Sequence, residues 1–227
     1  MDHYQRWYHL SYVPLPGGDS ATRNPARIAL AHLWQAGLDW DPELAPVKAL
    51  CENDRTLLLS ILRSKINTPL TSSMGRFFDA AASLIGVRQE AKYEAQAAIE
   101  LEALVDPAET GLYEFEIRAD EFDPAPLWQQ LLADWRRGVR STTLAARFHN
   151  SLVELNVELC RRIQRQTGVN TVALSGGVWQ NILLLERTIH QLRSAGFQVL
   201  YHHRVPTNDG SLALGQAMVA ARTAAQN

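Results

Sequence analysis

The chain has 227 residues, of which 46% are hydrophobic and 20% charged, as is ordinary for a globular protein with a real core. Its formal net charge of −2 gives no general attraction to nucleic acid or to acidic lipid. No apolar run reaches the roughly 18 residues that a membrane span needs, and the N-terminus lacks the layout of a secretion signal. We therefore expect a cytoplasmic protein with no nucleic-acid or membrane partner. Cys51 and Cys160 have no CxxC neighbour, so neither a zinc site nor a disulfide framework is indicated.

The first part of the chain is predicted to be mainly helical. Residues 1–20 form an extended leading segment, because two prolines and two glycines between positions 14 and 18 disfavour a long helix. Residues 21–166 follow a helical pattern, interrupted by one short strand at 113–117. The expected helices cover residues 25–36, 45–65, 74–85, 89–104, 127–138 and 142–166.

The last part, residues 167–227, has a different pattern. Short apolar strands are predicted at 171–174 and 197–200, with a glycine turn and a helix at 178–195 between them. This order is typical of a βαβ unit of a parallel sheet, and a closing helix at 211–224 makes it βαβα. No clear linker separates the two parts, so we interpret residues 1–227 as one α/β lobe with a largely helical insertion.

The glycine turn after the first of these strands is a candidate phosphate site. Ser175, Gly176 and Gly177 stand between a strand and a helix, where backbone N–H groups and the helix dipole favour an anion. Asn181 follows four residues after Gly177, and its amide is suited to a ribose or a base edge. A simple turn and a locally bonded Asn remain the structural alternatives, since the segment is neither a Walker loop nor a GxGxxG fingerprint.

Two further carboxylates are candidates. Asp209 lies in an Asn-Asp-Gly turn, where it either caps a helix or serves as a metal ligand at the end of a parallel strand. Gly75 and Asp79 are four residues apart and share one helix face, so a ligand that approaches the glycine can reach the carboxylate with two sugar hydroxyls. The structural alternative is a packing glycine beside a solvated Asp.

Four ordered motifs together resemble the second half of the carbamoyltransferase domain of the HypF family, over nearly the whole chain. They are TPLTSSMGRFFDA (68–80), YEAQAAIELE (93–102), ALSGGVWQN (173–181) and VPTNDGSLALGQ (205–216), with LPGGD (15–19) as a matching lead-in. The resemblance implies the second lobe of an actin-like or sugar-kinase-like fold, in which two lobes clamp a nucleotide.

The resemblance also implies roles for the candidate residues. Gly75 and Asp79 would bind the adenylate sugar, Ser175, Gly176, Gly177 and Asn181 the phosphate and nucleoside, and Asp209 a divalent metal, Fe or Zn. Carbamoyl phosphate and ATP would give carbamoyl-adenylate. The carbamoyl group would then pass to the C-terminal cysteine of a HypE-like acceptor protein, for the cyanide ligands of nickel–iron hydrogenases. No side chain resembles a nucleophile, so positioning and charge stabilisation would drive the reaction.

One departure from the family leaves alternatives open. The first-lobe histidine motif, which supplies two metal ligands, is absent, and His202 and His203 are interpreted as surface residues. We therefore expect a chain that is incomplete and weakly active or inactive alone. A related O-carbamoyl or tRNA threonylcarbamoyl transferase is one alternative, and a truncated, non-catalytic nucleotide-binding lobe is another.

Overall fold

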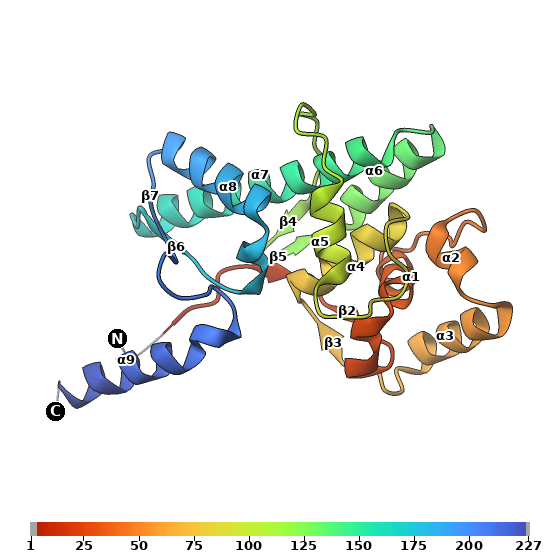
Figure 1. Ribbon diagram of the computed structural model, residues 1–227, viewed down its shortest axis with the longest axis horizontal. Coiled ribbons are helices and arrows are strands. Elements are labelled where there is room, and N and C mark those ends of the chain that lie inside the picture. Colours follow the sequence, from red (N-terminus) through yellow and green to blue (C-terminus); the bar gives the residue numbers. More distant parts are fainter. Residues whose placement is uncertain (1–3, 226–227) are drawn as a thin grey trace. The chain divides into compact units, whose positions relative to one another are not determined.

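The computed structural model describes residues 4–225, without the side chains of residues 19 and 20 (Figure 1). It contains two compact units, Met1–Leu155 (unit 1) and Asn156–Asn227 (unit 2). The boundary falls inside helix α7 (Ser141–Thr167), which continues across it. This continuity explains why the sequence shows no Pro-, Gly- or Ser-rich linker.

Short strands in unit 1 join segments that are far apart in the sequence. β5 (Glu121–Asp123) pairs with β1 (His9–Leu10) in parallel and with β4 (Glu116–Arg118) in antiparallel orientation. β2 (Val13–Pro14) pairs with β3 (Leu70–Thr71). The described part of the leading segment contains β1 and β2, which fix it to the body of unit 1, and the predicted extended range 1–20 ends early, because a 3-10 helix, η1 (Gly18–Arg23), begins at Gly18.

Two alanine-rich helices form the centre of unit 1. α1 (Pro25–Gln35) packs against α4 (Met74–Leu84), and both are buried over most of their length. α1 begins with Pro25 at its first position, where the missing N–H costs nothing. Small side chains on both helices allow a close approach. α6 (Ala125–Arg136) adds Trp128, whose ring lies 4.8 Å from that of Phe77, between centroids.

The helix predicted at residues 45–65 is wrong in one respect, because it is two helices. α2 (Ala45–Ala49) and α3 (Glu52–Ser64) are separated by Leu50 and Cys51, whose backbone is extended. Acidic residues in the first turn of α3 favour a helix start there through the helix dipole. Apolar spacing continues across the break, so periodicity alone does not reveal it.

The helix predicted at 89–104 is shorter than expected. α5 covers Gln96–Ala103, and Ala95 before it has a left-handed backbone with φ of 60°. The Gln96 side chain accepts a hydrogen bond from the Lys92 N–H at 2.8 Å, which holds the preceding residues in a turn. A side-chain acceptor thus competes with the helix for these backbone groups.

The strand predicted at 113–117 is shifted toward the C-terminus. Tyr113 lies outside it, because its N–H donates to Ser151 Oγ at 2.7 Å and its hydroxyl to Asp134 Oδ2 at 2.9 Å. These contacts hold Tyr113 in the core of unit 1. The strand begins at Glu116 and belongs to a hairpin with β5.

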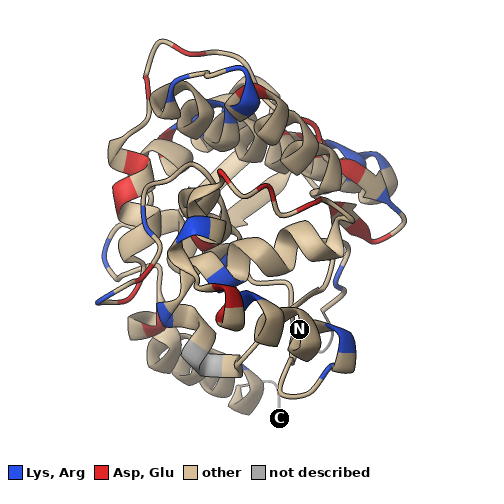
Figure 2. Cartoon of the chain, turned by 90° about the vertical axis from the view of Figure 1, so that its right-hand side faces the viewer, with Lys and Arg blue, Asp and Glu red and all other residues tan. Residues whose placement is uncertain are grey.

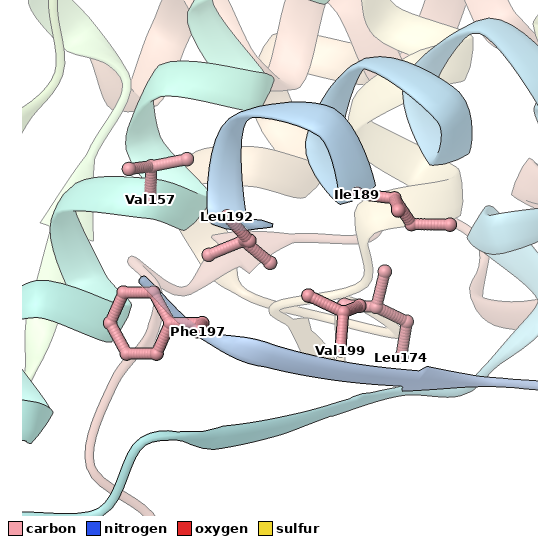
Figure 3. Close-up of a cluster of buried hydrophobic side chains, with 6 residues drawn as sticks. All are labelled: Val157, Leu174, Ile189, Leu192, Phe197 and Val199. Atoms are coloured by element: carbon pink, nitrogen blue, oxygen red, sulfur yellow. The ribbon is translucent and has the colours of Figure 1, made fainter. Parts of the chain in front are cut away.

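Unit 2 has the predicted βαβ order. β6 (Thr171–Leu174) and β7 (Gln198–Tyr201) are parallel, and α8 (Ile182–Ser194) connects them. The core between the helices and strands contains Val157, Leu174, Ile189, Leu192, Phe197 and Val199 (Figure 3). A final helix, α9 (Leu212–Ala224), follows a 3-10 turn, η3 (Asp209–Ser211).

Charged residues are spread over the surface. Figure 2 shows basic and acidic residues interspersed, as the small net charge suggests.

Both cysteines are free, with Cys51 exposed and Cys160 partly buried. Among the described helices, none has the length and apolar character needed to cross a membrane.

Candidate functional site

Gly75 lies in the first turn of α4, which begins after Ser73. The Ser73 hydroxyl accepts a hydrogen bond from the Arg76 N–H at 3.5 Å and so caps the helix. A Cβ built on Gly75 would meet only Ser73 Oγ, at 3.6 Å, which is an ordinary contact. Helix packing within unit 1 therefore does not require a glycine here, and the position leaves room for another group.

Asp79 is not solvated. Its carboxylate is 4% exposed and forms an ion pair with Arg76, one helical turn away, at 2.7 Å between Oδ2 and Nη1. Burial raises the pKa of Asp79 to about 6, and the Arg76 charge partly opposes this shift. The same guanidinium donates to the carbonyl of Thr22 at 3.3 Å. A sugar hydroxyl that uses this carboxylate would therefore compete with Arg76.

The turn after β6 in unit 2 is held by the segment that follows β7. Gly176 has a φ of 108°, a conformation that favours glycine. Its N–H donates to the Thr207 carbonyl at 2.9 Å, and the Thr207 hydroxyl donates back to the Gly176 carbonyl at 3.1 Å. Ser175 Oγ lies 3.1 Å from His202 Nε2. Both contacts fix the turn from one side.

The next two backbone N–H groups remain available. Gly177–Gln180 forms a 3-10 helix, η2, rather than the first turn of the predicted helix 178–195. Within the described part of the chain, no hydrogen bond has the N–H of Gly177 or Val178 as donor. Gly177 is exposed and Val178 partly so. Adjacent unpaired N–H groups at such a turn are suited to an anion.

Asn181 has a structural role as the N-cap of α8. Its Oδ1 accepts a hydrogen bond from the Leu184 N–H at 2.8 Å, and the residue is 8% exposed. The sequence places Asn181 one turn inside a helix, and this position is wrong, because the α-helix begins at Ile182. The amide oxygen is thus already used by the protein.

The second turn of unit 2 leaves a carboxylate exposed. Asn208, not Asp209, is the N-cap of η3, and its Oδ1 accepts from the Gly210 N–H at 3.1 Å. Asp209 is exposed, and its side chain has no ion pair or hydrogen bond with any described residue. A Cβ built on Gly177 would lie 3.9 Å from the Cβ of Asn208, so the two turns are neighbours.

The Asp209 carboxylate can supply one ligand of a metal site, but it cannot complete such a site alone. A free carboxylate oxygen suits a divalent cation. The residues that the structure describes contain no group of three or more His, Cys, Asp or Glu that could hold a metal ion. Any metal here would need further ligands from outside these residues.

A groove of about 730 Å³ adjoins these turns within unit 2. Ser175 and His202 form part of its wall, and Val205 and residues of α9 form much of the rest. A volume of this order accommodates a nucleotide-sized molecule. A smaller polar cavity of about 240 Å³ lies in unit 1, away from all of the predicted site residues.

The structure therefore brings Ser175, Gly176, Gly177 and Asp209 together in unit 2, while Gly75 and Asp79 form a separate group in unit 1. Sequence reasoning missed the roles of Thr207 and His202. The contact of Ser175 with His202 has no local sequence signal, because it depends on the register of β6 and β7, which places Leu174 opposite Tyr201.

Comparison with known proteins identifies the family of this chain. Residues 1–216 match the family described as "Carbamoyltransferase, Kae1-like Domain, second subdomain". The chain is 36% identical to carbamoyltransferase HypF of Synechocystis sp., over 95% of the chain and 30% of that protein. It is 39% identical to carbamoyltransferase HypF of Rhodobacter capsulatus, over 96% of the chain and 28% of that protein.

The fold is also similar to solved structures. Full-length HypF in a phosphate- and nucleotide-bound crystal form superposes with a TM-score of 0.88 and 38% identity, over 96% of this chain and 34% of that one. These likenesses confirm the α/β fold class and the resemblance of the four motifs. The chain spans about 30% of the length of these relatives.

Proposed function

The chain belongs to the HypF carbamoyltransferase family, and on this basis we propose that it forms the adenylate-binding second subdomain of a carbamoyltransferase. In this proposal ATP and carbamoyl phosphate give carbamoyl-adenylate, which the subdomain holds for transfer. The acceptor is the C-terminal cysteine of a HypE-like protein involved in hydrogenase maturation.

One observation carries this proposal. The turn at Gly176 is clamped by Thr207, and the N–H groups of Gly177 and Val178 remain unpaired beside an exposed Asp209. A rigid turn with free donors stabilises a phosphate without reorganisation, because its geometry exists before the ligand arrives. The adjoining groove then has room for the adenine base.

The chemistry assigned to the chain is positioning. The acceptor thiolate would attack the carbamoyl carbon, a C–S bond would form, and the bond from that carbon to the phosphate oxygen would break with loss of AMP. The donors at Gly177 and Val178 would stabilise charge on the departing phosphate. A metal bound with Asp209 as one ligand would supply Lewis-acid polarisation.

We assign the sugar of the adenylate to Gly75 and Asp79 of α4. The room at Gly75 and the absence of a packing reason for a glycine support this assignment. Since an ionised carboxylate accepts hydroxyl hydrogen bonds more strongly than a protonated carboxyl group, nucleotide binding should weaken as the pH falls below the Asp79 pKa of about 6. Asp79→Ala should weaken it at every pH.

The test is calorimetry of the whole chain with AMP, the product of the reaction. Gly176→Ala should reduce the affinity, because an alanine is strained at a φ of 108° and would distort the clamped turn. The matched control is Gly196→Ala, which carries similar strain at a φ of 89°, also has open space around it, and lies at the end of α8. If Gly176→Ala and Gly196→Ala bind AMP with equal affinity, the turn at Gly176 is not part of the nucleotide site.

The acceptor of the carbamoyl group distinguishes a HypF-like transferase from the related transferases. We expect a carbamoylated cysteine on a HypE-like protein, and transfer to a tRNA or to a hydroxylated antibiotic would assign the chain to a related transferase. Turnover by the isolated chain should be very low, because at least the remaining metal ligands would have to come from other residues.

A further inference from the structure

A serine and a histidine meet where the two strands of unit 2 end. β6 and β7 are parallel, and Leu174 lies opposite Tyr201, so the next residues, Ser175 and His202, leave the strands side by side. Ser175 Oγ lies 3.1 Å from His202 Nε2, and both residues are exposed. Both also line the groove that we assign to the nucleotide. A ligand in this groove would therefore lie beside the pair.

The contact between Ser175 and His202 is not the only one that holds the turn. Thr207 already forms two hydrogen bonds with Gly176, one to its N–H and one to its carbonyl. A hydrogen bond between two exposed side chains adds little stability, because water can replace either partner. The main consequence of the contact is the direction in which the Ser175 hydroxyl points its proton.

The proton on His202 decides that direction. A serine hydroxyl has one proton to donate and two lone pairs that accept. An unprotonated Nε2 would accept the Ser175 proton, and the serine would then present lone pairs to the groove, which repel a phosphate. A protonated Nε2 donates to Ser175 Oγ instead, and the serine proton is free to reach a phosphate oxygen.

The surroundings of His202 permit the second arrangement. Within the part of the chain that the structure describes, its side chain has no hydrogen bond except the one with Ser175, and no ion pair with a carboxylate. Since the hydrogen bond of one ring nitrogen sets which nitrogen is protonated, no described residue holds the proton on Nδ1. His202 can therefore keep a proton on Nε2.

We infer that His202 is a positioning residue for the phosphate of the nucleotide. Its Nε2–H donates to Ser175 Oγ and so directs the serine proton toward the phosphate, in the same turn as the unpaired N–H groups of Gly177 and Val178. Ser175 thus becomes a third donor to the phosphate, and His202 acts only through it. This inference rests on the proposed function, because that function locates the phosphate at this turn.

A double-mutant cycle with AMP, measured by calorimetry on the whole chain, tests the inference. Ser175→Ala should weaken AMP binding about tenfold or more, since it removes a hydrogen bond to a charged group. His202→Leu should weaken it about two- to tenfold, because the serine hydroxyl loses the partner that directs it. The double variant should bind AMP no more weakly than Ser175→Ala alone, since His202 acts through the serine.

Two further substitutions separate positioning from a general structural effect. His202→Gln keeps an N–H donor that can reach Ser175, and it should restore most of the natural affinity for AMP. His203→Leu is the matched control, because His203 is the neighbouring exposed histidine and its ring packs against Tyr201, 4.1 Å away between centroids. This control should change the affinity little.

Nitrogen NMR of the His202 imidazole observes the proton directly. The signals are assigned by their loss in His202→Gln. In the AMP complex of the natural chain, Nε2 should be protonated. An unprotonated Nε2 in that complex would overturn the inference, because the Ser175 proton would then point toward His202.

The results distinguish this inference from the proposed function. Unchanged AMP affinity in His202→Leu would overturn the positioning role. A double variant that binds more weakly than Ser175→Ala would also overturn it, because His202 would then contact the ligand itself. If either result is obtained while the natural chain binds AMP, only the role of His202 is contradicted. If the natural chain does not bind AMP, the proposed function is contradicted and the inference with it.

Discussion

The buried ion pair of Asp79 predicts a specific dependence of stability on pH. The pKa of Asp79 is about 6 in the folded chain, against an ordinary value of 3.8. Between these two values the folded state binds more protons than the unfolded state, so stability falls as the pH rises through this window. The stability contribution of protonated Asp79 is present below about pH 4 and is lost above about pH 6.

The size of this stability change follows from the shift in the pKa of Asp79. Two pKa units correspond to about 3 kcal/mol in the free energy of unfolding, as an upper value, because each unit is about 1.4 kcal/mol. Asp79→Asn removes this titration and keeps the shape of the side chain. The variant should therefore gain up to about 3 kcal/mol relative to the natural chain between pH 4 and pH 7.

The assay is urea unfolding of both proteins at several pH values, compared as a difference so that all other titrating groups cancel. Asp39→Asn, at an exposed position, is the control for the loss of one surface carboxylate. Arg76→Gln should move the Asp79 transition to higher pH, since the Arg76 charge lowers that pKa. A difference between Asp79→Asn and the natural chain that stays constant from pH 4 to pH 7 would refute the reasoning.

Three further changes test other parts of the structure. Asp134→Ala should lower the free energy of unfolding by about 1–3 kcal/mol, because it leaves the buried Tyr113 hydroxyl, which donates to Asp134 Oδ2 at 2.9 Å, without its acceptor; denaturant titration measures the loss. Leu192→Ala should cost about 2–5 kcal/mol, as Leu192 is fully buried in the core of unit 2, whereas Ile182→Ala, at a residue 56% exposed, should cost far less. Asp209→Ala should lower metal content in the complete enzyme, and full occupancy by elemental analysis would exclude Asp209 as a ligand.

The strongly periodic elements are those that the sequence predicts correctly. α1, α7 and the βαβ order of unit 2 follow from apolar spacing, and Pro25 marks the start of α1. Two of the errors occur where a single side chain overrides that pattern, whereas the break between α2 and α3 lies inside continuous apolar spacing. Gln96 holds the turn before α5, and Ser151 and Asp134 hold Tyr113 out of the strand. Such contacts depend on partners that local spacing does not specify.

The candidate site was predicted by residue type, and the structure adds which groups are already bonded. Among the predicted groups, the Gly176 N–H is bonded to Thr207 and the Asn181 oxygen to Leu184. The N–H groups of Gly177 and Val178 have no bond to the described residues. A motif does not reveal this difference, because it depends on segments that meet only in the fold.

This difference leads to a last prediction about the phosphate site. Val178→Pro removes one unpaired N–H without breaking a described hydrogen bond, at the start of a helical turn where proline is tolerated. It should weaken AMP binding about tenfold or more, since a hydrogen bond to a charged group contributes about 1.5–3 kcal/mol. Asn181→Ser keeps a capping oxygen for α8 and should change the affinity little. Calorimetry that finds the larger loss for Asn181→Ser would place the phosphate against the amide of Asn181 instead of the backbone of the turn.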